Sequence, residues 1–439
     1  MPRIVEKVFN DAMNRLEKDP AGKASNALDW LNRFALLDDH KQQISVVRNA
    51  MDKDTNWRDL YVNSMRELNP EVRNRVAYNF LFNAGLRSIP KQRKLAEKMG
   101  HDIPWAILFD PTDRCNLKCT GCWAGEYARS NDLEYDLLER IVSEGEKLHI
   151  HFYVVSGGEP LLRRDDLLTL AKNHRNSIFH VFTNSTLITE KFAAECVEAG
   201  NIVFAISVDG FETATDARRG KGVFRRIMAA STILRDHGIP FGFSTTYDRN
   251  NVDEVFSDAF VDMLIARGFL YGWYFTYMPV GIDPNVELMA TPEQRAFAYD
   301  RVQTFRKTKA AFIADFWNDG EATDGCIAGG RKYFHINAAG DIEPCAFIHY
   351  ASGNIRDMSV KEALSSPLFM AYQKRQPFNE NMLRPCPLID NPVSLVECLE
   401  ESAAYCTQCN KVDPAQLADR LKVYEARWGK IAESIWTKG

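Results

Sequence analysis

The chain has 439 residues, 45% of them hydrophobic and 26% charged, and its 54 basic and 59 acidic residues give a net charge of -5. This length suggests two or three domains, and the composition excludes global disorder and allows a sizeable core. No long basic run supports nucleic-acid binding. Residues 1–18 carry charges throughout, and the longest uncharged stretch, about 269–282, is too short to cross a bilayer. We therefore predict a cytoplasmic protein without a signal peptide or a membrane span.

Residues 1–104 are predicted to form a helical region. Val5, Phe9, Met13 and Leu16 recur at helical spacing, and Asn69-Pro70 is a typical helix start. We expect a helical cap packed on the main domain, with a substrate-recruiting surface as the alternative.

Strand and helix patterns alternate from residue 105 to about 310. Apolar strand candidates lie at 105–110, 150–156, 178–183, 202–208, 241–246 and 270–277, with amphipathic stretches between them. This alternation predicts an α/β fold whose parallel sheet curls into a partial (β/α)6 TIM-like barrel. Ligands bind at the carboxyl ends of such strands, where Cys115, Glu159, Asn184, Ser207 and Asp209 lie.

The sixth strand candidate is crowded with aromatic residues, namely Tyr271, Trp273, Tyr274, Phe275 and Tyr277. Alternation turns some of them into the barrel. Core packing is the default interpretation, and a lining for the substrate pocket is the alternative.

Residues 320–439 are predicted to form a separate, cysteine-rich domain. The segment 334–346 is typical of a hairpin that brings Cys326 and Cys345 together. A final helix begins at Asp413-Pro414, and its apolar stripe is predicted to dock on the barrel. The cysteines of this region are Cys326, Cys345, Cys386, Cys398, Cys406 and Cys409.

The most informative motif is C-x3-C-x2-C, formed by Cys115, Cys119 and Cys122. A zinc knuckle needs a nearby fourth cysteine or histidine, and neither type recurs before His149. Three thiolates without a fourth suit a [4Fe–4S] cluster with one open iron. We therefore predict an iron–sulfur site that can bind a small molecule.

With Gly157-Gly158-Glu159-Pro160 after the second strand, residues 105–310 resemble the radical S-adenosylmethionine (SAM) superfamily. The resemblance implies that SAM chelates the open iron and that the Gly-Gly-Glu-Pro segment lines its amino group. Glycines let the backbone approach closely, and its carbonyls, with Glu159, are suitable acceptors.

Other segments are similar to further SAM contacts of the family. Ser207 and Asp209 resemble its ribose motif, and Asn184 another cofactor contact. Residues 278–281 resemble the segment that lines the adenine. Arg218 or Arg219 is a candidate partner for the SAM carboxylate, with a solvated charge pair as the alternative.

One position departs from the family pattern. The family usually has an aromatic residue before the third cysteine, where this chain has Gly121. Trp123 is the candidate to cover the adenine instead.

The C-x13-G-x4-C spacing from Cys326 through Gly340 to Cys345 resembles the auxiliary-cluster domains called SPASM and Twitch. The later cysteines depart from the full SPASM pattern, so one auxiliary [4Fe–4S] cluster is the more economical interpretation. Cys386 is the predicted third ligand and Cys406 or Cys409 the fourth. Cys398 and Cys196 are predicted to be buried core thiols, and a zinc site of the last four cysteines is the alternative.

The resemblance implies an enzyme that accepts an electron from a flavodoxin or ferredoxin and cleaves SAM to a 5′-deoxyadenosyl radical. The radical removes hydrogen from an unactivated carbon. We expect a small-molecule or lipid-like biosynthetic substrate. A maturase of peptide or protein side chains is one alternative, although residues 1–104 lack the hairpin of a winged-helix peptide-binding domain. A non-catalytic iron–sulfur or zinc redox sensor or scaffold is the other.

Overall fold

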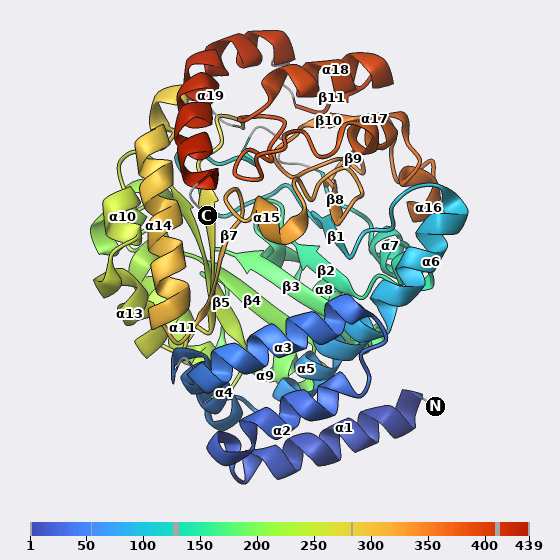
Figure 1. Cartoon of the computed structure of the whole chain (residues 1–439), viewed down its shortest axis with the longest axis vertical. Helices are drawn as coiled ribbons and strands as arrows, with labels where there is room; N and C mark the ends of the chain where they lie inside the picture. Colours follow the sequence, from blue (N-terminus) through green and yellow to red (C-terminus); the bar gives the residue numbers. More distant parts are fainter. Residues whose placement is uncertain (1, 54, 126–130, 282–283, 409–412, 438–439) are drawn as a thin grey trace.

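A computed structural model of the chain describes residues 2–53, 55–125, 131–281, 284–408 and 413–437. Its centre is a nine-stranded sheet with the order β7-β6-β5-β4-β3-β2-β1-β8-β9, in which only β8 and β9 pair antiparallel (Figure 1). The strands of this sheet are β1 (Ala106–Phe109), β2 (Phe152–Val155), β3 (Ile178–Thr183), β4 (Ile202–Ser207), β5 (Phe241–Tyr247), β6 (Tyr271–Thr276), β7 (Phe312–Asp315), β8 (Tyr333–Ile336) and β9 (Ile342–Glu343).

All six predicted strands are present, but the sheet continues beyond them on both sides. Strand β7 pairs with β6, and the predicted hairpin, β8–β9, joins the barrel sheet because β8 pairs in parallel with β1. Leu108 of β1 thus lies opposite His335 of β8. The cysteine-rich region therefore begins as an extension of the barrel sheet.

Side chains of the inner strands alternate between two hydrophobic layers. On β2, Tyr153 and Val155 pack outward against the covering helices, whereas Phe152 and Val154 belong to the inner cluster of the barrel. This alternation places every second residue of a strand inside the barrel. The helices of this part are α7 (Tyr135–Lys147), α8 (Arg164–Asn173), α9 (Glu190–Ala199), α10 (Glu212–Arg219), α11 (Val223–Asp236), α12 (Val252–Val255), α13 (Asp258–Ala266) and α14 (Pro292–Thr308), with short 3-10 turns at Pro160–Arg163 and Val286–Leu288.

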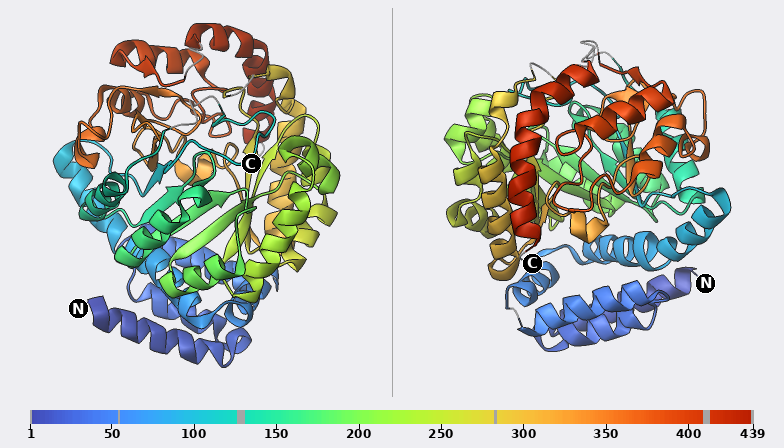
Figure 2. Two further views of the ribbon diagram at one scale, coloured as in Figure 1. Left: turned by 180° about the vertical axis from the view of Figure 1, so that it is seen from behind. Right: turned by 45° about the horizontal axis from the view of Figure 1, so that its top comes forward.

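The N-terminal region is helical, as predicted, and lies at the opposite end of the molecule from α18 (Figures 1 and 2). Phe9, Tyr78 and Phe82 form its own small core. Among the described residues, no helix has the length and apolar composition that crossing a membrane requires. The elements are α1 (Pro2–Glu17), α2 (Pro20–Asn32), α3 (Asp38–Lys53), α4 (Thr55–Glu67), α5 (Pro70–Tyr78), the π-helix Asn79–Leu86 and α6 (Ser88–Met99).

The C-terminal region packs back on the barrel through α19. Trp428 of α19 is fully buried, donates its indole N–H to the Leu383 carbonyl and lies 4.2 Å from the Arg295 guanidinium of α14. Arg295 in turn forms a fully buried ion pair of 2.6 Å with Asp390. The remaining elements are α15 (Gly320–Thr323), α16 (Val360–Ala363), α17 (Pro367–Arg375), α18 (Pro392–Ser402), α19 (Pro414–Trp436) and the antiparallel pair β10 (Tyr350–Ala351) and β11 (Tyr405–Cys406).

Candidate active site

The loop that carries Cys115, Cys119 and Cys122 leaves the carboxyl end of β1. It is held from one side by Asp132, which accepts hydrogen bonds from Thr112 (2.5 Å) and Arg114 (2.6 Å). The loop therefore presents its three sulfurs at the end of the barrel where ligands bind.

The Gly157-Gly158 segment after β2 packs directly on this loop, backbone against backbone. The Gly158 amide donates to the Thr112 carbonyl (3.0 Å), and the Glu159 amide donates to the Arg114 carbonyl (2.8 Å). A Cβ at Gly158 would lie 2.2 Å from the Arg114 oxygen, and one at Gly157, whose φ is +108°, 2.5 Å from the Thr112 oxygen. Only glycine permits this approach.

The Glu159 carboxylate is fully buried and engaged by the protein itself. It accepts hydrogen bonds from the Thr183 hydroxyl (2.6 Å) and from the amides of Asn184 (2.9 Å) and Leu161 (3.0 Å). Burial raises the pKa of Glu159 to about 7, although these donors oppose the shift. Glu159 thus ties the end of β2 to the end of β3, where the side-chain amide nitrogen of Asn184 lies 4.0 Å from the Cys115 sulfur.

Asp209, after β4, forms a buried ion cluster with both arginines of α10. Its carboxylate accepts from the Arg219 Nε (2.6 Å) and the Thr246 amide (3.0 Å), and Arg218 approaches to 3.6 Å. The arginine side chains are only 13% and 11% exposed, so the solvated charge pair is wrong. Burial raises the pKa of Asp209, but the two guanidinium groups outweigh it and the net shift is downward. Because Arg219 also lies 4.0 Å from the Cys119 sulfur, this cluster brings positive charge to the cysteine loop.

The structure explains the glycine before the third cysteine. A Cβ at Gly121 would lie 2.5 Å from the ring of Tyr277, so an aromatic residue has no room there. Trp123 turns toward the C-terminal region, where its ring centroid lies 5.6 Å from that of Phe347 and 6.0 Å from that of His335.

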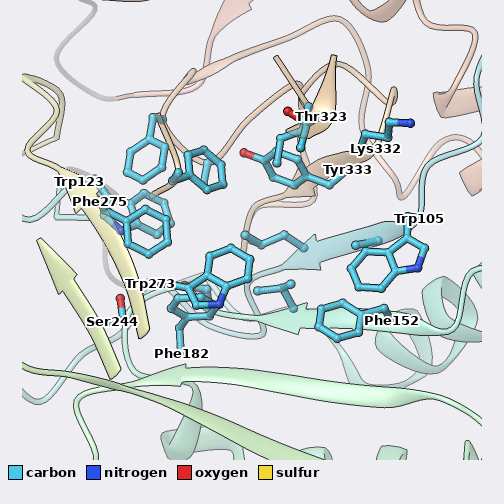
Figure 3. Close-up of a pocket in the computed structure, with 18 of the residues that line it drawn as sticks. Trp105, Trp123, Phe152, Phe182, Ser244, Trp273, Phe275, Thr323, Lys332 and Tyr333 are labelled. Atoms are coloured by element: carbon cyan, nitrogen blue, oxygen red, sulfur yellow. The ribbon is translucent and has the colours of Figure 1, made fainter. Parts of the chain in front are cut away.

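One cavity of about 850 Å³ adjoins all three cysteines. Its size is near the upper end of ordinary ligand pockets, so it has room for a cofactor and part of a substrate. From the cysteines it extends along an aromatic wall of Trp273, Phe275, Phe182, Phe152 and Trp105 (Figure 3). Its outer rim includes residues of α3 and α6, so the N-terminal helices help to form it.

The residues predicted to contact SAM do not all reach this cavity. Pro160 is buried at the start of its 3-10 turn, and Asp209 lies behind Arg219. The predicted contacts that do line the cavity are Gly157, Gly158, Glu159, Asn184, Ser207, Arg218, Arg219, Met278 and Trp123. Of the aromatic residues on β6, Trp273 and Phe275 face it, whereas Tyr274 packs outward.

The donor set at the cysteine loop fits an iron–sulfur cluster. Burial raises the pKa of Cys115 to about 11. Burial also raises the pKa of Cys122, and the nearby charges of Arg218 and Arg219 oppose this shift without reversing it. Metal binding ionises such thiols, and the guanidinium groups compensate part of the charge. Among the described residues, no three His, Cys, Asp or Glu groups gather as one metal ion requires. A multi-iron cluster does not need that convergence, because each thiolate binds a different iron.

A second set of thiols gathers behind the opposite wall of the cavity. Burial raises the pKa of Cys326, and the nearby thiols of Cys386 and Cys345 raise it further, which shows that the three cysteines lie close together. Burial likewise raises the pKa of Cys345 to about 12, and the Tyr333 hydroxyl donates to its sulfur (2.7 Å). Their neighbours Ile327 and Ala346 line the cavity. This set suits an auxiliary cluster that is separated from the cavity by the residues of its wall.

The other cysteines of the prediction have different places. Cys398 is fully buried on α18 and bonds to the Ala371 carbonyl (3.6 Å), and Cys196 is buried in the barrel core. Cys406 lies on β11, opposite Tyr350. Cys409 lies outside the described residues.

Sequence reasoning left the roles of His335 and its partners unassigned. His335, on β8, bonds to Asp110 at the end of β1 (2.9 Å) and to Glu343 on β9 (2.7 Å), and all three are buried. Burial alone lowers the pKa of His335, but the two carboxylates raise it to about 10. The acidic residue just before the cysteine loop was the available signal, but its partner is 225 positions away. This network ties the base of the cysteine loop to the C-terminal hairpin.

A parallel α/β barrel with a cysteine triad at its strand ends and a second thiol set beside the same cavity defines an iron–sulfur enzyme. Residues 109–259 match the radical SAM superfamily, and residues 326–388 match the iron–sulfur cluster-binding domain SPASM. The chain is a radical SAM enzyme with a C-terminal SPASM domain. Its cofactors are a [4Fe–4S] cluster, SAM and an auxiliary iron–sulfur centre.

Two curated relatives illustrate the similarity. The AdoMet-dependent heme synthase of Methanosarcina barkeri is 26% identical over 292 residues, covering 60% of this chain and 82% of the relative. The mycofactocin maturase MftC of Mycolicibacterium smegmatis is 28% identical over 291 residues, covering 62% of this chain and 72% of the relative.

A solved structure shares the fold. The crystal structure of SuiB from Streptococcus suis bound to S-adenosylmethionine aligns with a TM-score of 0.56 at 16% identity, covering 69% of this chain and 76% of that one.

Proposed function

We propose that this radical SAM enzyme reductively cleaves SAM and removes a hydrogen atom from an unactivated carbon of an apolar, small-molecule or lipid-like substrate. The observation that carries the proposal is the cavity of about 850 Å³, which joins the three loop cysteines to a long aromatic wall. When bound, the cluster and SAM supply a carbon-centred radical, and a flavodoxin- or ferredoxin-type donor supplies the electron.

The residues of the chain bind, orient and exclude water. We assign the SAM amino group to the backbone carbonyls of Gly157 and Gly158 and a ribose hydroxyl to Ser207, because all three residues line the cavity beside the cysteines. The Asp209 carboxylate acts indirectly, by holding Arg219 against Cys119. The aromatic wall keeps water from the reacting carbon.

Anaerobic reconstitution with iron and sulfide, followed by SAM and dithionite, tests the reaction. Chromatography should detect 5′-deoxyadenosine from the wild type. The Cys115→Ala variant is the control, and equal yields from the two proteins would refute the proposal.

Modification of a peptide side chain is the second candidate. The similarity to the maturase MftC supports it, since that relative is matched over 72% of its length. Mass spectrometry of a short-peptide library incubated with reduced enzyme and SAM tests it, and a SAM-dependent mass change would favour this candidate.

A further inference from the structure

The cavity has two polar ends and an apolar middle. Cysteines, Ser207, Asn184 and the two arginines Arg218 and Arg219 form the inner end, and a second group of charged side chains forms the outer one. In Figure 3, Trp123 and Phe275 lie on one side, Trp273 and Phe182 in the centre, and Trp105 and Phe152 on the other side, below Lys332. The charged residues of the outer end are Asp39, Arg93, Asp102, Asp324, Arg331 and Lys332.

Three polar side chains along the middle are already bonded within the protein. The Trp105 indole donates to the Ala84 carbonyl (3.0 Å), the Tyr333 hydroxyl to Cys345 (2.7 Å) and the Thr323 hydroxyl to the Gly325 carbonyl (2.8 Å). A peptide backbone in this section would need partners for its N–H and C=O groups. An alkyl chain or an apolar ring needs none, so the middle favours an apolar body.

At the outer end, the two arginines are engaged but Lys332 is not. Arg93 pairs with Asp39 at 2.6 Å, and Arg331 donates to the carbonyls of Cys326 and Thr323. Within the described part of the chain, no carboxylate lies within ion-pair distance of the Lys332 ammonium; Asp102 and Asp324 act on it only at longer range. Lys332 is an exposed residue on the rim of the cavity. Partial burial of its ammonium and then the charge of Arg331 lower its pKa, and an anion placed here would oppose this shift.

We propose that the substrate is an anionic amphiphile whose apolar body lies along the aromatic wall and whose carboxylate or phosphate pairs with Lys332 at the outer end. This inference rests on the proposed function, because it names the substrate class of the same cavity. The arrangement places the anionic group away from the cysteines and an apolar carbon toward them. An apolar segment held between Phe182 and Phe275 is then the part that meets the reactive end of SAM.

Isothermal titration calorimetry on the reconstituted full chain tests the inference. The probes share one alkyl chain: decanoate, decyl phosphate, decanol and decyltrimethylammonium, each below its micellar concentration. We expect the two anions to bind about tenfold more tightly than decanol, the size of one charge-assisted contact, and the cation most weakly. A preference for decyl phosphate over decanoate would identify a phosphate head group, and the reverse a carboxylate.

Variants separate the ammonium from the wall. Lys332→Gln should abolish the preference for anions and Lys332→Arg should keep it, whereas Lys361→Gln, an exposed lysine on α16, is the matched control. Trp105→Ala should lower the affinity for all four probes alike. Circular dichroism checks the fold of each variant. Equal binding of decanoate and decanol, no binding of any probe, or an unchanged preference in Lys332→Gln would overturn the inference.

The same preparation separates the two proposals. Wild-type protein that yields 5′-deoxyadenosine but shows no anion preference would refute the substrate class alone. Protein that prefers the anions but yields no 5′-deoxyadenosine would refute the proposed reaction while the anion site stands.

Discussion

The two cysteine sites of this protein differ in how they meet the cavity. Cys115, Cys119 and Cys122 come from one short loop, line the cavity directly and have Arg218 and Arg219 beside them. Cys326, Cys345 and Cys386 come from segments far apart in the chain and lie behind its wall, with Tyr333 bonded to Cys345. The first site is built to hold a small molecule, whereas the second influences it only through intervening residues.

The largest expected effect tests the first site. Replacing Cys115 by alanine should abolish SAM cleavage, because the loop then lacks one of its three thiolates. The measurement is 5′-deoxyadenosine after reduction with dithionite. Cys386→Ala should keep this product and lose about four irons per chain, one cubane.

The matched control is Cys196→Ala, a core thiol on α9 that should keep both the product and the iron. If Cys386→Ala abolished SAM cleavage while Cys115→Ala did not, the assignment of the two sites would be reversed.

The next largest effect concerns the buried ion pair beside the second site. Arg295 and Asp390 form a fully buried ion pair, and Asp390 also accepts from the Cys386 amide (3.2 Å). Asp390→Asn should lower the free energy of unfolding by about 3–5 kcal/mol, because it leaves the Arg295 charge buried without its partner. Chemical denaturation measures this loss.

The double variant Arg295→Met/Asp390→Leu should recover most of that stability, since no charge is then stranded. Equal losses of unfolding free energy in the single and the double variant would show that packing, and not charge, determines the stability of this contact.

A smaller effect is expected at the charge cluster of the first site. Asp209→Asn should raise the KM for SAM about tenfold, because Arg219 loses a charge-assisted partner and leaves Cys119. Initial rates of 5′-deoxyadenosine formation at varied SAM measure it. Asp236→Asn, an exposed carboxylate on α11, is the control, and an identical KM in both variants would contradict the assigned role.

The smallest effect concerns the network that joins the two sites. The pKa of His335 is raised to about 10, so its stabilising charge is fully present below the ordinary histidine value and is lost as the pH rises through about 10. The Tm of the wild type should therefore fall between neutral pH and about pH 10 by about 3 °C more than that of His335→Gln. Parallel Tm profiles for the two proteins would show that His335 is neutral in the folded state.

Local patterns predicted much of the fold. The six strand candidates, the helices between them, the hairpin and the final helix are all present, because each follows from hydrophobic periodicity within its own segment. Strand β7 was missed, and so was the pairing of β8 with β1. Such pairings depend on edges that only the folded sheet presents.

The sequence alone determined the first cysteine site, because three thiols within eight positions must share one loop wherever that loop lies. It also showed which glycines follow β2, although not that they touch Thr112 and Arg114. The tertiary structure decided three further features. They are the gathering of Cys326, Cys345 and Cys386, the ion pair between Asp209 and Arg219, and the position of the Lys332 ammonium at the outer end of the cavity. These depend on contacts between distant segments, which are chosen by packing and by the cost of burying unpaired charge.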